Sequence, residues 1–376
     1  MKLQKKYIYL FECCRLVQGF SRSLILDTQR CNVEFIPNDL AKILKKLKRK
    51  SIYEVTSNLS AENQKIVEEY IDFLIAKELA IMLDKEECSL FPKMSIDWDM
   101  PCFISNAVIT YSDTTKNRFL EVLEQLDGLL CSSFVIIFSD ILQYSDLISI
   151  IKMIEAFSFQ DIKIMLTYHS SFNIENIPDL LLYHNIISTI SIFNSKLFPE
   201  KDIENVEFFE DPLPEYVSCG NISSSMFIFN LPFFTEAQQH NTCLNRKLCI
   251  DKEGNIKNCP AMERSFGNIK DTTLQEAIEK EGFKDLWFIN KDKIDVCKDC
   301  EFRYMCTDCR CFIKDPENTY SQPAKCGYNP YICKWAEQED YVPVEECGSY
   351  GKATGFVPDV AKIKALNQQI WGEDDE

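Results

Sequence analysis

The sequence predicts an α/β fold built from three successive parts, and three observations lead to this prediction. Short β-rich runs and two amphipathic helices fill residues 1–83. Strands and helices then alternate over residues 102–234, after a charged, proline-containing connector at 84–101. Cysteines gather in residues 235–345, and 346–376 add a helix and an acidic end. Eleven of the eighteen cysteines lie from Cys219 to Cys333.

Composition excludes several classes of protein. The 376 residues are 46% hydrophobic and carry a formal net charge of −17. A globular chain this acidic is a poor ligand for nucleic acid or for anionic membrane surfaces, where Lys and Arg supply the affinity. The basic start Met1–Lys6 precedes too short an apolar run for a signal peptide, and no run is long enough to span a membrane. We therefore expect a cytoplasmic protein with no nucleic-acid or membrane partner.

The first part has the element order of a winged helix. Its expected strands are Tyr7–Phe11, Leu24–Leu26 and Val33–Ile36, its expected helices open at Pro37 and near Ser60, and Ala80–Leu83 is the expected wing strand. This order resembles the peptide-recognition domain of many peptide-maturation enzymes, where a leader peptide adds a strand to a sheet edge. A DNA-binding winged helix is the alternative, which the acidic balance and the absence of a basic recognition helix disfavour. The lysines and Arg49 of residues 42–50 are consistent with a solvated helix face or with a binding site for an acidic peptide.

The second part predicts a parallel α/β layer or a partial barrel. The expected strands are Phe103–Tyr111, Phe134–Phe138, Ile162–Tyr168, Ile186–Phe193 and Val206–Phe209, and the expected helices are Asn117–Leu130, Asp146–Phe157 and a short one near Asp179. The sequence contains no glycine-rich phosphate loop. His169, His184 and His240 are too scattered to predict a metal-binding pair.

The cysteine-rich part predicts metal binding. In a reducing compartment, paired C-x2-C motifs bind metal more often than they form disulfides. The pairs Cys297/Cys300 and Cys306/Cys309 suffice for one zinc ion, which leaves seven of the eleven cysteines from Cys219 to Cys333 unused. Two iron–sulfur clusters would use eight cysteines and fit the supply better, so zinc stays the alternative. We expect a helix over Asp271–Glu281, capped by Asp271, to interrupt this part.

The cysteine spacing resembles that of the SPASM domain, which follows the catalytic barrel in many radical SAM peptide-modifying enzymes. The resemblance rests on three parts of the sequence: Cys243-x10-Gly254-x4-Cys259, then Cys297-x2-Cys300-x5-Cys306, and the later Cys326. The resemblance implies two auxiliary 4Fe–4S clusters. It also implies that the second part is a radical-SAM-like barrel.

Carried over by position, the resemblance implies two ligand sets. The first cluster would use Cys243, Cys249, Cys259 and Cys309, and the second Cys297, Cys300, Cys306 and Cys326. The family spacing expects a cysteine where this chain has Arg310, so Cys309 or Cys311 is the nearest substitute. Cys219 could replace Cys249, and Cys333 could serve either site.

The amino-acid sequence around these cysteines is similar to that of one subfamily, the SPASM-domain peptide maturases of grasp-with-spasm systems. The matching pieces are Asn241–Lys247, Gly254–Pro260, Phe266–Ile269, Cys300–Cys306 and Pro323–Tyr331. This resemblance implies an ATP-grasp ligase and a precursor peptide as partners, and a product of the graspetide kind.

One expected motif is missing. A radical SAM enzyme carries C-x3-C-x2-C after its first barrel strand, whereas residues 111–118 contain no cysteine. We therefore expect a degenerate barrel with no S-adenosylmethionine-binding cluster and name no catalytic residue. Cys13, Cys14, Cys31, Cys88, Cys102 and Cys131 lie outside any ligand spacing and are interpreted as buried small hydrophobic residues.

The leading hypothesis is a maturation protein that binds a precursor peptide for a partner ligase and carries two auxiliary clusters. Whether such a protein is itself an enzyme stays open. One alternative is a redox enzyme that modifies the peptide with its clusters. The other is a scaffold stabilised by zinc.

Overall fold

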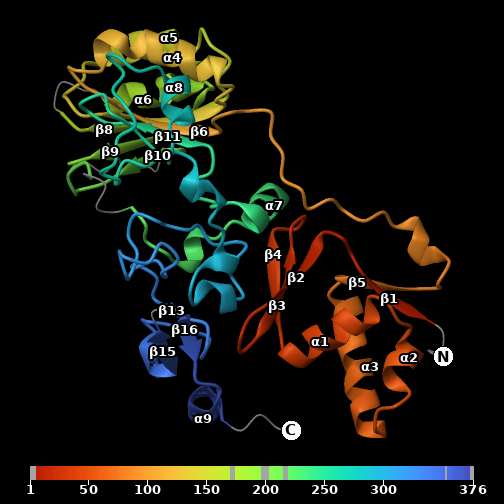
Figure 1. The fold of residues 1–376 in the computed structure, drawn as a ribbon. Coiled ribbons are helices and arrows are strands. Elements are labelled where there is room, and N and C mark those ends of the chain that lie inside the picture. The colour runs from red at the N-terminus through yellow and green to blue at the C-terminus, as the bar shows by residue number, and fades with distance from the viewer. Residues whose placement is uncertain (1–5, 170–173, 196–202, 215–218, 352–353, 373–376) are drawn as a thin grey trace. The chain divides into compact units, whose positions relative to one another are not determined.

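The computed structural model describes residues 6–169, 174–195, 203–214, 219–351 and 354–372 (Figure 1). Most of the basic start Met1–Lys6 and of the acidic end lies outside these ranges. The chain divides into two compact units. Unit 1 comprises Met1–Trp98, Ile222–Thr242 and Ile289–Glu376, and unit 2 comprises Asp99–Asn221 and Cys243–Phe288.

Unit 2 is built on a seven-stranded sheet with the order β10-β9-β8-β7-β6-β11-β12. All neighbouring strands run parallel except β12, which is antiparallel to β11. The strands are β6 (Asn106–Tyr111), β7 (Ser133–Phe138), β8 (Asp161–Thr167), β9 (Ile187–Phe193), β10 (Val206–Phe208), β11 (Lys247–Ile250) and β12 (Ile256–Lys257).

Four helices pack against this sheet in one apolar core (Figure 1). They are α4 (Phe119–Gly128), α5 (Tyr144–Ile154), α6 (Ile177–Tyr183) and α8 (Leu274–Glu279). Their buried faces repeat at helical spacing, as Phe119, Val122 and Leu126 do in α4. The predicted α/β fold is confirmed. The prediction that Asp271 caps α8 was wrong, because Thr273 is the N-cap residue and forms a capping box with Glu276.

Two strands of the sheet come from the cysteine-rich part of the sequence. β11 pairs with β6 in parallel, and β12 returns beside it through a turn that contains Gly254 at φ 85°. The expected boundary between residues 234 and 235 falls inside α7 (Leu231–Gln239) of unit 1. The strand β11 has only four residues, so its sequence carries little periodic signal.

The N-terminal part of unit 1 contains two small sheets and three helices (Figure 1). Its strands are β1 (Tyr7–Leu10), β2 (Cys14–Gln18), β3 (Ser23–Asp27), β4 (Asn32–Ile36) and β5 (Ala80–Leu83), and its helices are α1 (Asn38–Leu47), α2 (Ile52–Thr56) and α3 (Ala61–Ala76). β1 pairs with β5, and β2-β3-β4 form an antiparallel sheet. The expected strand at 80–83 and the helix start at Ser60 are confirmed, whereas β2 was not predicted.

The remainder of unit 1 has few regular elements. They are α7, β13 (Tyr328–Asn329), β14 (Lys334–Trp335), β15 (Gly348–Gly351), β16 (Gly355–Pro358) and α9 (Val360–Trp371). Val17 and Leu24 of the β2-β3-β4 sheet share a core with Phe302, Met305 and Tyr328. This core joins the N-terminal sheet to the cysteine-rich segment within one unit. Among the described residues, no helix is long and apolar enough to cross a membrane.

Candidate metal centres

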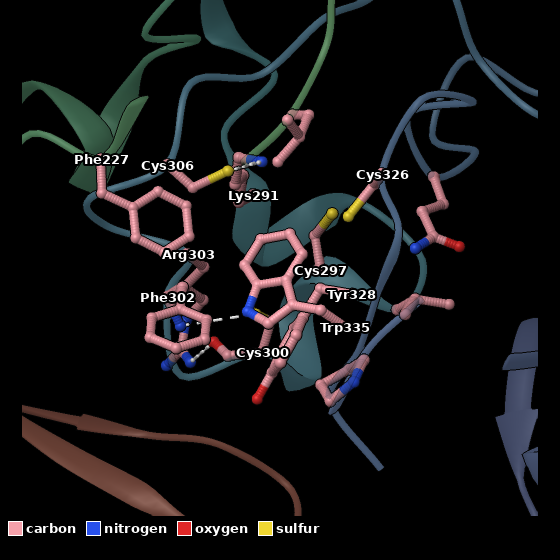
Figure 2. A pocket seen from close by; sticks show the side chains of 14 residues that line it. Phe227, Lys291, Cys297, Cys300, Phe302, Arg303, Cys306, Cys326, Tyr328 and Trp335 are labelled. Atoms are coloured by element: carbon pink, nitrogen blue, oxygen red, sulfur yellow. Dashed lines mark hydrogen bonds between the residues drawn. The ribbon is translucent and has the colours of Figure 1, made fainter. Parts of the chain in front are cut away.

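The four cysteines assigned to the second site line one cavity in unit 1. They are Cys297, Cys300, Cys306 and Cys326, which lie up to thirty residues apart in sequence. Figure 2 shows the sulfur atoms of Cys297 and Cys326 pointing toward one another and Lys291 reaching Cys306. The fold therefore gathers the whole predicted set around one space.

Local backbone geometry places these cysteines. The C-x2-C turn is a 3-10 helix, η8 (Cys297–Asp299), and the Cys300 N–H donates to the Cys297 carbonyl at 3.0 Å. Val296 enters this turn at φ 66°, a left-handed conformation that reverses the chain and is uncommon for a β-branched residue. Cys326 comes two residues before β13, where it pairs with Ile222 in an isolated bridge.

Aromatic side chains wall the cavity. The ring centroids of Phe302 and Tyr328 lie 5.0 Å apart, those of Tyr328 and Trp335 4.9 Å, and those of Phe227 and Phe302 4.9 Å. Rings packed at these distances exclude water and lower the local dielectric. A charged inorganic centre held here would be shielded from solvent, which is one of the levers on an iron–sulfur potential.

Burial disfavours the thiolate form of the cysteines in this cavity. Burial raises the pKa of Cys297 to about 11 and raises the pKa values of Cys306 and Cys326 as well. Burial also raises the pKa of Cys300 well above its ordinary value. Metal ligation requires thiolates, so loading this site releases protons.

A buried lysine supplies positive charge to the cavity. Lys291 is 5% exposed, and its Nζ donates to the Cys306 Sγ at 3.2 Å. Burial acts to lower the pKa of Lys291, but the neighbouring Cys306 and Cys297 raise it above its ordinary value. The ammonium group would therefore offset part of the negative charge that four thiolates carry once the site is loaded.

A second group of cysteines lies in unit 2. A hydrogen bond with Cys219, together with burial, raises the pKa of Cys259, and Cys243 contributes through its charge. Lys247 donates from its Nζ to the Cys243 Sγ at 3.7 Å. Burial acts to lower the pKa of Lys247, but Cys243, Cys259 and Cys219 raise it. Both groups of cysteines thus carry one lysine ammonium next to a sulfur.

The two remaining predicted ligands of the first site are Cys249 and Cys309. Cys249 is fully buried in β11, where the charged groups acting on it are Asp251, Lys257 and Lys247. Cys309 belongs to unit 1, where its Sγ accepts from the Phe312 N–H at 3.4 Å. Within unit 2, Cys219 shares its electrostatic environment with Cys243 and Cys259.

Arg310 stands where the SPASM spacing expects a cysteine, and its side chain has a structural role. Its guanidinium donates to the carbonyls of Thr319 and Ser321 at 3.0 and 2.8 Å and to the carboxylate of Asp308 at 2.8 Å. The second Asp308 oxygen accepts from the amide of Asn241 at 2.6 Å. Arg310 therefore fixes the loop that follows the cysteines.

Sequence reasoning missed a polar network next to the cavity. Arg22, in the turn between β2 and β3, donates to the carboxylate of Glu301 at 2.6 Å, and the Tyr328 hydroxyl donates to the same oxygen at 2.6 Å. Glu301 is fully buried and directly follows Cys300. Cys333 lies beside this network, and burial raises the pKa of its thiol to about 12. No spacing rule links residue 22 to residue 301, so only the fold reveals it.

The loop after β6 contains a cluster of hydrogen-bonded hydroxyl groups. The Ser112 N–H donates to the Thr115 hydroxyl at 2.8 Å, and that hydroxyl donates to the Thr110 carbonyl at 2.8 Å. The Ser112 hydroxyl donates to the Lys252 carbonyl at 2.6 Å. Hydroxyl groups close this loop, and residues 111–118 contain no cysteine.

Comparison with known proteins identifies part of the chain. Residues 242–301 match the SPASM family, an iron–sulfur cluster-binding domain. No curated protein matches the chain. Three crystal structures of Streptococcus suis SuiB are similar: the protein by itself, bound to S-adenosylmethionine and bound to precursor peptide SuiA. Each is 12% identical with a TM-score of 0.34 and covers 84% of this chain, and the share of the SuiB chain is 99%, 99% and 98% in that order.

Proposed function

We propose that this protein takes part in the maturation of a ribosomally made peptide. In this proposal it binds the leader of a precursor peptide, works beside an ATP-grasp ligase and carries two 4Fe–4S clusters. The observation that carries it is the cavity of Cys297, Cys300, Cys306 and Cys326, which begins within the segment that matches SPASM.

The donor set fits an iron–sulfur cluster. Four thiols, aromatic walls and a lysine ammonium on one sulfur are the groups that hold and tune such a centre.

For the first cluster we propose Cys219, Cys243 and Cys259 as three of the ligands. Their shared electrostatic environment and the lysine at Cys243 support this assignment. The clusters would supply electron transfer or a rigid cross-link when bound. What the chain itself contributes is burial, orientation and the positive charge of Lys247 and Lys291.

The β2-β3-β4 sheet supports the leader-binding role. β4 (Asn32–Ile36) pairs with β3 through its full length and, among the described strands, with no other. Its outer edge therefore offers unpaired backbone groups to an added strand. Phe35 on β4 is 45% exposed and offers apolar contact to a bound peptide.

Binding of the precursor tests this assignment. We expect precursor peptide to slow amide exchange in residues 32–36, because an added strand would hydrogen-bond the edge of β4. The β15–β16 hairpin is the matched control and should exchange at an unchanged rate. Deletion of residues 1–83 should abolish binding, and an unchanged affinity in that variant, with iron content retained, would sink the assignment.

We also propose that the protein does not cleave S-adenosylmethionine. The loop at 111–118 contains no thiol to hold the cluster that binds this cofactor, and its hydroxyl groups bond to one another and to backbone. The cluster-loaded chain, given S-adenosylmethionine and a strong reductant, is expected to form no 5′-deoxyadenosine above the level of a protein-free control. Formation of that product by the chain alone would contradict the proposal.

A further inference from the structure

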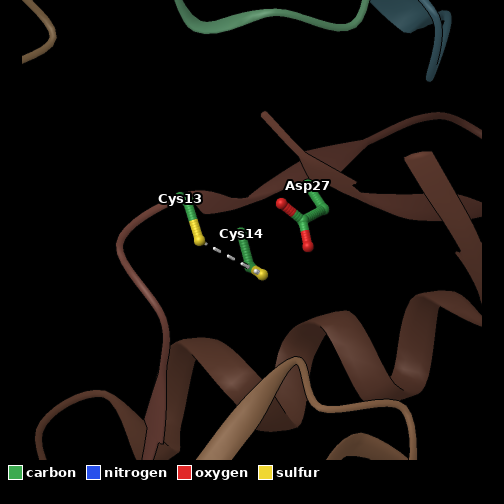
Figure 3. Close-up of side chains that lie close together, drawn as sticks. All are labelled: Cys13, Cys14 and Asp27. Carbon is green, nitrogen blue, oxygen red and sulfur yellow. Dashed lines mark hydrogen bonds between the residues drawn. The ribbon is translucent and has the colours of Figure 1, made fainter. Parts of the chain in front are cut away.

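Two neighbouring cysteines and an aspartate form a compact group far from the cysteine-rich segment in sequence. The ligand atoms of Cys13, Cys14 and Asp27 all lie within 4.8 Å of one another (Figure 3). The two sulfurs are 4.0 Å apart. Among the described residues, these form the only group of three potential metal ligands packed this closely.

Strand register brings this group together. Cys14 and Asp27 are direct cross-strand partners at the ends of β2 and β3, so their side chains share one face of the sheet. Cys13 lies in the turn before β2, and its carbonyl accepts from the Thr28 N–H at 2.9 Å and from the Thr28 hydroxyl at 3.0 Å. The hairpin thereby fixes all three residues. Sequence spacing could not reveal the group, because thirteen positions separate its two halves.

The carboxylate is already oriented for a ligand. Asp27 is 4% exposed, and its Oδ1 accepts from the backbone N–H groups of Gln29 and Arg30 at 3.0 Å each. Its Oδ2 lies 3.6 Å from the Arg30 Nε, which is longer than a good hydrogen bond. One oxygen is therefore anchored by backbone, and the other is the one available to an ion. Anchoring of this kind is how outer-shell groups orient metal ligands.

The donor atoms select the class of metal. Two sulfurs on one tetrahedral zinc ion lie about 3.8 Å apart, close to the separation found here. Calcium and magnesium take oxygen ligands, whereas two thiolates and one carboxylate suit a borderline-soft divalent ion. Two thiolates, one carboxylate and a divalent ion sum to one negative charge, which the Arg30 guanidinium would offset.

We propose that Cys13, Cys14 and Asp27 bind one zinc-class divalent cation, with the fourth position open. The ion would tie the turn before β2 to the end of β3 and so brace the N-terminal sheet. Cys14 is 3% exposed and part of the apolar core of this domain, so the ion would sit at the margin of that core. Cys31, interpreted from sequence as buried, is exposed and lies four residues after Asp27.

Cobalt(II) bound to the full-length chain tests this site. The chain is first loaded with iron and sulfide, so that the cysteine-rich sites are filled, and cobalt(II) is then titrated as a spectroscopic stand-in for zinc. We expect one equivalent to bind with a thiolate-to-cobalt absorption band. Cys31→Ser is the matched control and should bind like the unaltered chain. Cys13→Ser and Asp27→Asn should each bind at least about tenfold more weakly, the loss found even for outer-shell changes.

Two outcomes would overturn the proposal. One is that the unaltered chain takes up no cobalt(II) once its iron is loaded. The other is that Cys13→Ser binds cobalt(II) as tightly as the unaltered chain. Circular dichroism and iron content identify a variant that fails to fold, and Asp27→Asn, which keeps the shape of the side chain, provides an independent reading.

Discussion

Replacing Cys306 by alanine is expected to halve the iron content of the chain, from about eight to about four atoms. Cys306 lines the cavity and accepts the Lys291 hydrogen bond, so its loss removes one of four thiolates and leaves a buried ammonium without its sulfur partner. A 4Fe–4S cluster with three protein thiolates exposes one iron and is more readily lost. The measurement is iron and acid-labile sulfide per chain after anaerobic reconstitution.

An exposed cysteine provides the control for this variant. Cys31→Ala removes a thiol from the β3–β4 hairpin, outside both groups of cysteines assigned to clusters, and should leave iron at about eight atoms per chain. If Cys306→Ala also keeps about eight, the cavity in unit 1 does not hold a cluster through this residue.

Replacing Arg22 by alanine should destabilise unit 1 by about 3 kcal/mol, at the low end of the range for breaking a buried ion pair. Glu301 is fully buried, and its Oε2 has no hydrogen-bond partner, so it depends on Arg22 and Tyr328 at its other oxygen. The Arg22 guanidinium also lies 3.9 Å from the centre of the Phe35 ring. The low end applies because Arg22 is 30% exposed and the Tyr328 bond remains.

Urea unfolding measures this effect against a surface pair. Lys42 and Asp39 are 2.8 Å apart and both well exposed, so Lys42→Ala should change the free energy of unfolding by less than about 0.5 kcal/mol. If the free energy of unfolding of Arg22→Ala lies within about 0.5 kcal/mol of that of the unaltered chain, the buried network does not stabilise unit 1.

Much of the fold was predictable because its elements carry strong local signals. The parallel strands are apolar runs such as Ser133–Phe138, which is bounded by a helix on each side. β2 escaped prediction because Arg15 and Gln18 interrupt a run of only five residues. β11 escaped because its pairing with β6 lies more than a hundred residues away in sequence and leaves no local trace.

The candidate sites show where spacing stops being informative. The C-x2-C-x5-C piece lies in one compact segment, so its three cysteines could be grouped from sequence, and Cys326 joins them at the cavity. Cys249 also fits the spacing, and it is fully buried in β11. Cys219, Asp27 and Arg22 reach their partners only through the tertiary fold, which a spacing rule does not contain.

Metal and sulfide content of the intact chain, purified without oxygen and measured together with its absorption spectrum, decides whether the protein holds two 4Fe–4S clusters. Two 4Fe–4S clusters predict about eight irons and about eight sulfides per chain with broad visible absorption. A colourless protein that contains zinc but neither iron nor sulfide would contradict the account and make the cysteine-rich segment a zinc-stabilised scaffold.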